Sequence, residues 1–268
     1  MIRLIASDMD GTLLEDGGHC ISPEYHPVIQ SLLKQGIFFA GASGRQFHSI
    51  AELFPEEAQS MYYITDGGGA LRSYTQVLKA FAIDETMLGK MVEDALKLPG
   101  CDVMLCGLKH SYVRQKDSQL YRWLVDGYHF QVELNPTLTC PPGEQIVKLS
   151  IYHPTDTEAI VNQWFTPKWG DKVQIASAGI QWMDCVSLKA NKGNALAALQ
   201  ERLGISPEET MVFGDNINDI PMLKQAKYSY AVENARQEVK EAANFGCPGW
   251  REDGVLQILK QVSEGKVW

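Results

Sequence analysis

Hydrophobic and polar residues alternate along the first quarter of the chain in two rhythms. Largely apolar runs occupy residues 2–6, 37–42 and 62–65, which predicts buried strands. The segments between them, about 23–35 and 46–53, have apolar residues at helical spacing. Buried strands that alternate with helices are typical of a parallel sheet with crossover connections, so the pattern predicts an α/β fold.

The same alternation returns toward the end of the sequence. Residues 192–203 have helical spacing, and a short apolar run at 211–213 predicts a strand. We expect the last strand of the chain at 228–232. We therefore interpret the first and last stretches as halves of one domain.

The middle of the chain, from about residue 79 to 187, has a different pattern in which helical spacing and short β-like runs follow one another irregularly. The predicted helices are 85–98, 119–127 and 156–165, and the predicted strands are 103–106, 112–114, 146–153, 173–176 and 180–184. Because both ends of this stretch return to the same core, we expect an inserted domain. Residues 1–78 and 188–268 would form a Rossmann-like parallel-sheet core, and residues 79–187 an inserted α+β cap that determines substrate specificity.

Composition and charge narrow the possible functions. The chain has 268 residues, of which 45% are hydrophobic, and this is enough for one large or two modest cores. Its formal net charge is -9, and no cluster of Lys and Arg offers the basic face that nucleic-acid binding requires. The six cysteines have no metal-binding spacing and indicate reduced thiols. Because no apolar run could span a bilayer and the first residues show no export signal, we expect a cytoplasmic protein without membrane partners.

Two carboxylates stand at the end of the first predicted strand, in the segment 8–14 that reads Asp-Met-Asp-Gly-Thr-Leu-Leu. A strand that leaves a parallel sheet at its carboxyl end delivers its last side chains to the crevice where such sheets bind ligands, and Gly11 permits a sharp turn there. Such a pair suits phosphoryl chemistry, with Asp8 as the nucleophile and Asp10 as proton donor and acceptor. Paired aspartates also occur in calcium loops and solvated turns, so this motif alone leaves the function open.

Three further segments follow the aspartate pair along the chain: Ala-Ser-Gly-Arg at 42–45, Lys-Gly at 192–193, and Gly-Asp-Asn-Ile-Asn-Asp at 214–219. In this order the four segments resemble the signature of the haloacid dehalogenase superfamily. They are most similar to its Cof-like phosphatases, which carry a large α/β cap inserted after the second motif. The resemblance continues to 231–235 and 252–255, whereas the middle third matches by length and position rather than by motif.

The resemblance implies catalytic and metal-binding roles. Asp8 would be the nucleophile that becomes an aspartyl phosphate, and Asp10 would be the general acid and base. Lys192 would bridge the nucleophile and the phosphate. The implied cofactor is Mg²⁺, with Asp8, Asp10 through its backbone carbonyl, Asp215 and Asp219 as ligands. For Asp219 a second role is open, which is to anchor Lys192.

The resemblance also implies a set of phosphate-binding and substrate-binding residues. The Ser43 hydroxyl and the Gly44 amide would donate hydrogen bonds to a phosphate oxygen. Arg45 would bind phosphate or substrate, with an ordinary ion pair as the alternative. Asn218 and Asn234 would orient these groups by hydrogen bonds.

The sequence departs from the family pattern after the third predicted strand. Where many relatives read Asn-Gly-Ala, this chain reads Asp-Gly-Gly-Gly-Ala at 66–70. We expect Asp66 either to alter specificity or to repel anionic substrates. In the cap, Trp182 and Asp184 lie near the return to the core, and they are the first candidates for contact with the substrate.

Together these observations predict a Mg²⁺-dependent phosphatase that acts on small phosphorylated metabolites, either sugar phosphates or phosphorylated cofactors. A phosphomutase or phosphotransferase of the same fold is an alternative that the sequence does not separate. A metabolite-binding sensor without catalysis is disfavoured because Asp8, Asp10, Lys192 and Asp215 are all present. A dehalogenase is disfavoured because that chemistry has no use for an acid at Asp10. We expect a monomer or a small homo-oligomer.

Overall fold

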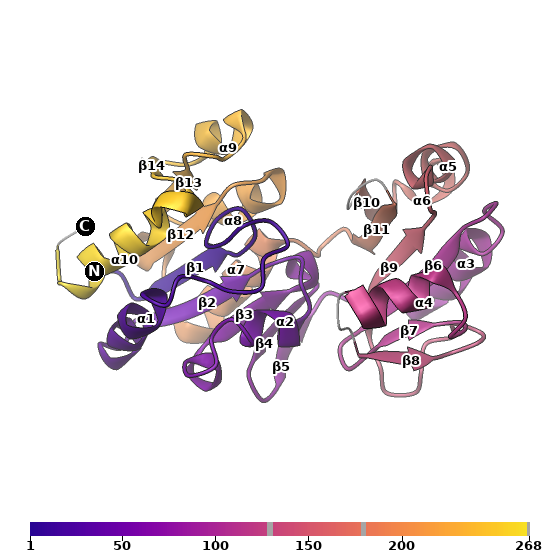
Figure 1. Ribbon diagram of the computed structural model, residues 1–268, viewed down its shortest axis with the longest axis horizontal. Coiled ribbons are helices and arrows are strands. Elements are labelled where there is room, and N and C mark those ends of the chain that lie inside the picture. The colour runs from indigo at the N-terminus through magenta and orange to yellow at the C-terminus, as the bar shows by residue number, and fades with distance from the viewer. Residues whose placement is uncertain (128–130, 178–180, 267–268) are drawn as a thin grey trace. The chain divides into compact units, whose positions relative to one another are not determined.

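The computed structural model describes residues 1–127, 131–177 and 181–266 (Figure 1). The chain divides into two compact units, each with its own sheet. Unit 1 consists of Met1–Lys79 and Asn191–Trp268, and unit 2 consists of Ala80–Ala190. Within the described ranges, no helix has both the length and the apolar character needed to cross a membrane.

Unit 1 is organised around one sheet in which β1 is a central strand. The strands follow in the order β14 (Phe245–Cys247), β13 (Tyr228–Val232), β12 (Thr210–Gly214), β1 (Leu4–Asp8), β2 (Phe38–Ala42), β3 (Tyr62–Thr65), β4 (Ala70–Ser73) and β5 (Val77–Ala80). From β14 to β3 all neighbours are parallel, and β4 pairs with β3 in the antiparallel direction. Every residue of β1, β12 and β13 is buried, as expected for parallel strands that are covered on both faces.

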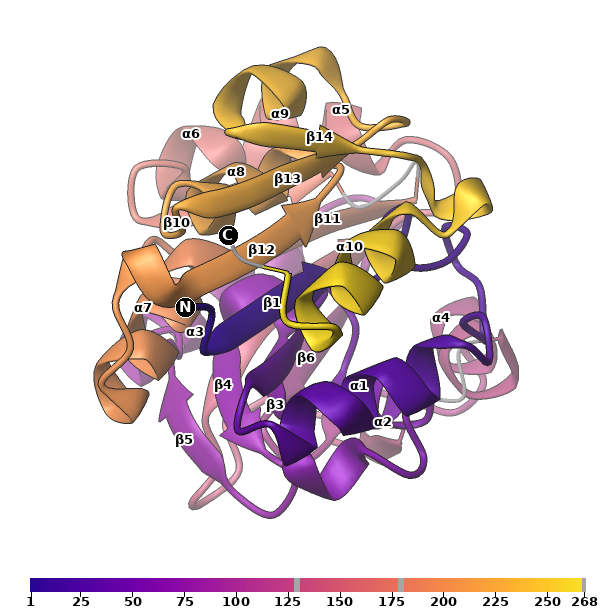
Figure 2. The same cartoon turned by 90° about the vertical axis from the view of Figure 1, so that its left-hand side faces the viewer.

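Helices cover both faces of this sheet. They are α1 (Tyr25–Lys34), α2 (Phe47–Ala51), α7 (Lys192–Leu203), α8 (Ile220–Leu223), α9 (Gln237–Ala242) and α10 (Gly254–Ser263). α1 packs against α10 and α7 packs against α8, and the two pairs lie on opposite sides of the sheet (Figure 2). Short 3₁₀ helices complete the unit: η1 (Ala58–Ser60), η2 (Asp66–Gly68), η4 (Pro207–Glu209), η5 (Ile217–Asp219) and η6 (Trp250–Glu252).

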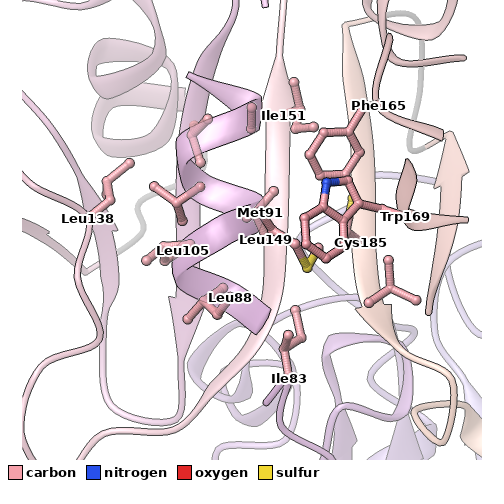
Figure 3. Packing of buried hydrophobic residues seen from close by; sticks show 14 of the residues in the cluster. Ile83, Leu88, Met91, Leu105, Leu138, Leu149, Ile151, Phe165, Trp169 and Cys185 are labelled. Carbon is pink, nitrogen blue, oxygen red and sulfur yellow. The ribbon is translucent and has the colours of Figure 1, made fainter. Parts of the chain in front are cut away.

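Unit 2 is an α+β unit with its own core. Its sheet has the order β10 (Val173–Ser177), β11 (Trp182–Ser187), β9 (Ile146–Tyr152), β6 (Asp102–Gly107), β7 (Ser111–Val113) and β8 (Val132–Leu134). Its helices are α3 (Glu85–Ala95), α4 (Gln119–Arg122), α5 (Thr157–Trp164) and α6 (Thr166–Trp169), with a π-helical turn η3 (Trp123–Gly127) after α4. Alternate strand residues such as Leu105, Leu149 and Ile151 join Met91 of α3 and Trp169 of α6 in one buried cluster (Figure 3).

The predicted α/β fold class, with a parallel-sheet core, is confirmed. The prediction that 228–232 is the last strand is wrong, because β14 follows it; with three residues, two of them exposed, β14 has too little apolar pattern to predict a strand. The predicted helix 119–127 is α-helical only as far as Arg122 and continues as the π-helical turn η3. In the predicted strand 180–184, residue 180 lies outside the described residues, and β11 begins at Trp182.

Candidate active site

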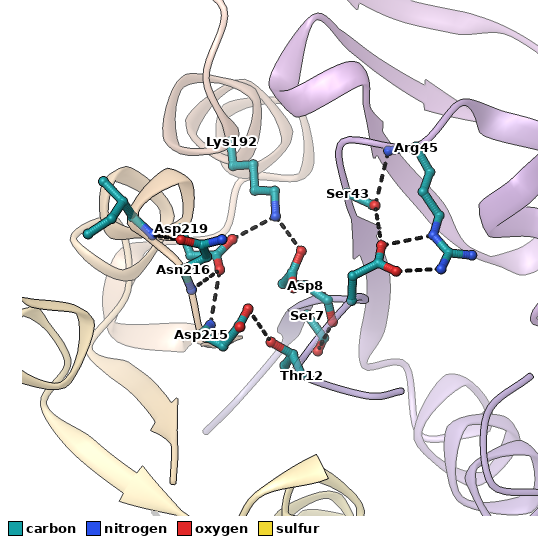
Figure 4. A network of polar contacts seen from close by, with 11 residues as sticks. Ser7, Asp8, Thr12, Ser43, Arg45, Lys192, Asp215, Asn216 and Asp219 are labelled. Carbon is teal, nitrogen blue, oxygen red and sulfur yellow. Dashed lines mark hydrogen bonds and ion pairs between the residues drawn. The ribbon is translucent and has the colours of Figure 1, made fainter. Parts of the chain in front are cut away.

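Three neighbouring strands of unit 1 end at the same edge of the sheet and bring the sequence motifs together. β1 ends at Asp8, which is paired with Ala42 at the end of β2, and Ser7 is paired with Phe213 of β12. Ser43 therefore follows β2, and Asp215 follows β12, at the edge where β1 presents its aspartate. The carboxyl edge of a parallel sheet is where open α/β folds bind their ligands. Figure 4 shows the polar contacts that result.

A buried ammonium group bridges two buried carboxylates in this site. Lys192 begins α7 and is 1% exposed; its Nζ donates to Asp8 Oδ1 and, at 2.6 Å, to Asp219 Oδ1 (Figure 4). Removing an ion from water costs several kcal/mol unless a counterion and hydrogen bonds offset it, and this cluster provides both. Because there are two carboxylates and one ammonium, the cluster carries an excess negative charge.

Burial and the neighbouring charges shift the pKa values of the cluster. Burial raises the pKa of Asp8 well above its usual value, and the Asp219 charge adds to the rise, although Lys192 opposes it. Burial lowers the pKa of Lys192, but Asp219 and Asp8 outweigh it, so that the pKa of the ammonium is raised. Lys192 is therefore a permanent cation at neutral pH.

Asp215 completes an acidic group next to this cluster. Its Oδ1 accepts a hydrogen bond from Thr12 Oγ1 at 3.3 Å, and burial together with the Asp219 charge raises its pKa to about 6. Gly11, with φ +76°, allows the close approach, because a Cβ at this position would lie 2.4 Å from Asp215 Oδ2. The geometry of the site thus requires the glycine of the Asp-Met-Asp-Gly motif.

The acidic group fits a divalent cation. One carboxylate oxygen from each of Asp8, Asp215 and Asp219 lies within 4.8 Å of the others. Hard oxygen ligands of this kind suit Mg²⁺, and burial together with the Asp219 charge raises the pKa of both Asp8 and Asp215, so a cation here would favour their ionised forms. Asp219 Oδ2 also accepts from the backbone amides of Asp215 and Asn216, both at 3.0 Å, so Asp219 holds the lysine and its own loop at once.

Asp10 points to a different set of partners. The Arg45 guanidinium binds both oxygens of its carboxylate as a fork, with Nε to Oδ2 at 2.8 Å, and Arg45 also donates to the Gly18 carbonyl at 2.7 Å. Ser43 Oγ donates to Asp10 Oδ2 at 3.4 Å, and the Gly17 amide donates to Oδ1 at 3.0 Å. A bidentate pair of this type fixes both position and orientation. Of the two roles left open for Arg45, the structure shows an ion pair, and it is with the second aspartate of the motif.

The remaining predicted residues are divided between the site and its supporting loops. Gly44 and Asn218 line a polar cavity of about 270 Å³ together with Asp8, Asp10, Asp215 and Asp16. Asn234 is not among the lining residues; its Nδ2 donates to the Gly11 carbonyl at 2.7 Å, and it therefore supports the turn after β1. A larger cavity of about 660 Å³ between α9 and β14 has a mainly apolar lining, and its lining includes residues 231–233 but no residue of the four main motifs.

The sequence patterns did not predict two further contacts of the site. Thr12 lies within the first motif, and its hydroxyl contact with Asp215 could have been suspected from that position alone. Asn216 and Asp219 form a capping box at the start of η5, and the Asn-x-x-Asp spacing at 216–219 is the sequence signal of such a cap.

The comparisons with known proteins agree with this geometry. The family model described as haloacid dehalogenase-like hydrolase matches residues 5–259. The chain therefore belongs to the haloacid dehalogenase-like hydrolases. The resemblance inferred from the four motifs is confirmed, as is the prediction of a hydrolase.

Individual relatives narrow the class further. The chain is 28% identical to a 5-amino-6-(5-phospho-D-ribitylamino)uracil phosphatase of Escherichia coli over 261 residues, 97% of this chain and 96% of the relative. It is 26% identical to a Bacillus subtilis phosphatase of the same name, over 97% and 95% of the two chains. A solved structure from Eubacterium rectale is 38% identical, covers 97% of this chain and 99% of its own, and superposes with a TM-score of 0.92. The named relatives are phosphatases that span the same length as this chain.

Proposed function

We propose that the protein is a Mg²⁺-dependent phosphatase that hydrolyses small phosphorylated metabolites through an aspartyl phosphate on Asp8. The observation that carries this proposal is the separation of the two motif aspartates. Asp8 is buried in the lysine-bridged acidic cluster, and Asp10 is held by Arg45 and Ser43 outside it. Two carboxylates in different environments can serve as nucleophile and as proton carrier.

In the first step, Asp8 would attack the phosphorus atom. Lys192 occupies Oδ1, so the attack falls to Oδ2, and the bond between phosphorus and the ester oxygen breaks. Asp10 would give a proton to the leaving alkoxide, and for this one of its contacts with Arg45 or Ser43 must open so that an Asp10 oxygen can carry that proton. Lys192 offsets negative charge on the transferred phosphoryl group.

In the second step, Asp10 would take a proton from water while the water oxygen attacks phosphorus. The bond from phosphorus to Asp8 breaks, so phosphate leaves and the Asp8 carboxylate is restored. The Ser43 hydroxyl and the Gly44 amide stand at the same edge and would donate to phosphate oxygens. The carboxylates of Asp8, Asp215 and Asp219 would hold Mg²⁺, together with the Asp10 carbonyl that the family resemblance implies, and the cation would offset negative charge next to the phosphoryl group.

The substrate class is a phosphate monoester of a small metabolite. The relatives' names refer to a phosphorylated ribitylaminouracil and, in a Citrobacter koseri relative that is 23% identical, to HMP-PP. Both kinds of compound belong on a test panel with sugar phosphates. We also propose that unit 2 determines which esters are accepted, with Trp182 and Asp184 of β11 on the sheet face opposite to its main core. On that face Asp184 accepts from Ser150 at 2.6 Å, and Trp182 packs on Tyr152 at 5.0 Å between ring centroids.

The proposal is tested with a panel of phosphorylated metabolites assayed with Mg²⁺, in the wild type and in Asp8→Asn. We expect phosphate release that depends on Mg²⁺, and a labelled phosphoenzyme in rapid-quench samples of the wild type only. Asp8→Asn keeps the shape of the side chain but cannot attack phosphorus. Residual activity within tenfold of the wild type would contradict the role of Asp8. A single turnover that returns phosphate to the substrate's carbon skeleton would identify a mutase instead.

A further inference from the structure

The turn η2, Asp66–Gly68, contacts two separate parts of the candidate site. The Asp66 amide donates to the Arg45 carbonyl and the Gly67 amide donates to the Ser43 carbonyl, both at 3.0 Å. On its other side the turn packs against the start of α7. The segment in which the sequence departs from the family pattern therefore supports both the serine loop and the lysine helix.

Gly68 makes the closest of these contacts. With φ at +99°, a Cβ on Gly68 would lie 2.1 Å from the backbone carbon of Asn191, 2.3 Å from its oxygen and 2.6 Å from the Lys192 nitrogen. All three are backbone atoms of the helix start, which no side-chain rotation can move. Gly67 has φ +68° in the same turn, but among the described residues, its chain neighbours aside, no atom would lie within 4 Å of a Cβ there.

The helix start that Gly68 contacts has little freedom of its own. Asn191 caps α7 by accepting from the Asn194 amide at 2.8 Å, and Lys192 is the first residue of the helix. The Lys192 side chain is buried and is held at its far end by Asp8 and Asp219. A displacement of the helix start would therefore carry the ammonium away from its carboxylates.

We propose that Gly68 is a positioning residue that fixes how far Lys192 Nζ reaches toward Asp8 and Asp219. The effect that we expect on the rate rests on the proposed phosphatase function. A methyl group at Gly68 forces the turn and the Asn191–Lys192 backbone about 1 Å apart to restore ordinary contact distances. Because two backbone hydrogen bonds hold the turn to the serine loop, the start of α7 takes up this shift. A shift of this size would lengthen the 2.6 Å contact between Lys192 Nζ and Asp219 to about 3.6 Å, which is beyond hydrogen-bonding distance. Gly68 acts through Lys192 and does not touch the reacting groups.

The test compares Gly68→Ala with Gly67→Ala. Both variants place alanine at a positive φ in the same turn, but only the first meets the backbone of α7. We expect Gly68→Ala to lower kcat on an aryl phosphate by at least tenfold with less than a threefold change in KM, and Gly67→Ala to stay within threefold in kcat. Equal kcat values for the two variants, each corrected for its folded fraction, would overturn the proposal.

Crystal structures of the two variants give a readout that does not depend on activity. In Gly68→Ala the distance from Lys192 Nζ to Asp8 should lengthen beyond hydrogen-bonding range, and in Gly67→Ala it should not. An unmoved lysine in Gly68→Ala would reject the positioning role. If the wild type hydrolysed no phosphate ester, the proposed function would fail while this structural comparison would still decide the role of Gly68.

A second variant covers the case in which Gly68→Ala does not fold. Asn191→Ala removes the cap from the same helix start without inserting an atom. We expect it to lower kcat by about threefold to tenfold, whereas Asp84→Ala, which removes the cap of α3 in unit 2, should leave kcat unchanged. Equal kcat values for these two cap variants would show that the start of α7 does not set the rate.

Discussion

The raised pKa of Asp215 predicts that Mg²⁺ stabilises the protein more at pH 8 than at pH 5. In the folded protein without metal this pKa is about 6, compared with an ordinary value of 3.8. A group whose pKa is raised by folding stabilises the folded state at low pH and loses that contribution as the pH rises through the folded value. Without metal, stability should therefore fall between about pH 4 and pH 6, and a cation that binds the ionised carboxylate should reverse the loss above pH 6.

The magnitude follows from competition between protons and Mg²⁺ for Asp215. At pH 5 only about one tenth of a group with a pKa of about 6 is ionised, so the apparent affinity is roughly tenfold weaker than at pH 8. At Mg²⁺ concentrations well above the dissociation constant, this factor is about 1.4 kcal/mol of stabilisation. For a domain of this size it corresponds to about 3–6 °C in Tm. Without metal, the loss of folding stability between about pH 4 and pH 6 is at most about 3 kcal/mol. Solvent screening makes the loss smaller than this, because Asp215 is only partly buried.

The assay is thermal unfolding of the full-length protein from pH 5 to pH 8, with Mg²⁺ or with EDTA and without phosphate. The Mg²⁺-induced rise in Tm should grow with pH in the wild type and should be largely lost in Asp215→Asn. Asp66→Ala, which changes a buried aspartate outside the acidic group, should behave as the wild type does. An equal Tm rise at pH 5 and pH 8 would refute the assignment of Asp215 as a metal ligand.

Three further outcomes are expected. Asp10→Asn should lower kcat by about 10²–10⁴-fold on alkyl phosphates and less on aryl phosphates, whose leaving groups need no proton; equal losses when the first step limits the rate would contradict the acid role. Arg45→Lys keeps the charge but loses the fork on Asp10, so kcat should fall by roughly tenfold with the Mg²⁺ requirement unchanged, as a metal titration would show. Trp182→Leu should change the ranking of substrates on a metabolite panel but leave a small aryl phosphate within about threefold, and a common loss on all substrates would argue for a purely structural role.

The sequence predicts the strands that are largely apolar runs and the motifs that stand at their ends. β1, β2, β3, β12 and β13 are buried runs, and their parallel pairing explains why aspartates distant in sequence meet at one edge. Strands such as β14 are too short to show a period, and only their neighbours in the sheet define them. Sequence patterns therefore predict the centre of the sheet better than its edges.

Within the site, the sequence predicts which residues gather but not how they pair. Arg45 was compatible with a phosphate or with a carboxylate partner, and only the folded loop shows that Asp10 lies within reach of its guanidinium. The contact of Gly68 with the start of α7 joins segments that are far apart in the chain, and a glycine triplet alone indicates no more than a turn. Asn234 looks like a site residue in the motif, although its side chain supports the Gly11 carbonyl. The chemical roles assigned to these residues remain predictions.

The central place of β1 also determines when the protein acquires its activity during synthesis. Leu4 pairs with Phe38 on one side and with Thr210 on the other, so the whole of unit 2 is made before β12 and Lys192 exist. At about 5–20 residues per second, β1 stands at an open sheet edge for roughly 10–30 s on the ribosome. The strand pairs of unit 2 join nearer segments and can form in that interval. During synthesis Asp8 is therefore present before Lys192. The candidate site is incomplete at that edge until the last third of the polypeptide emerges and β12 pairs with β1.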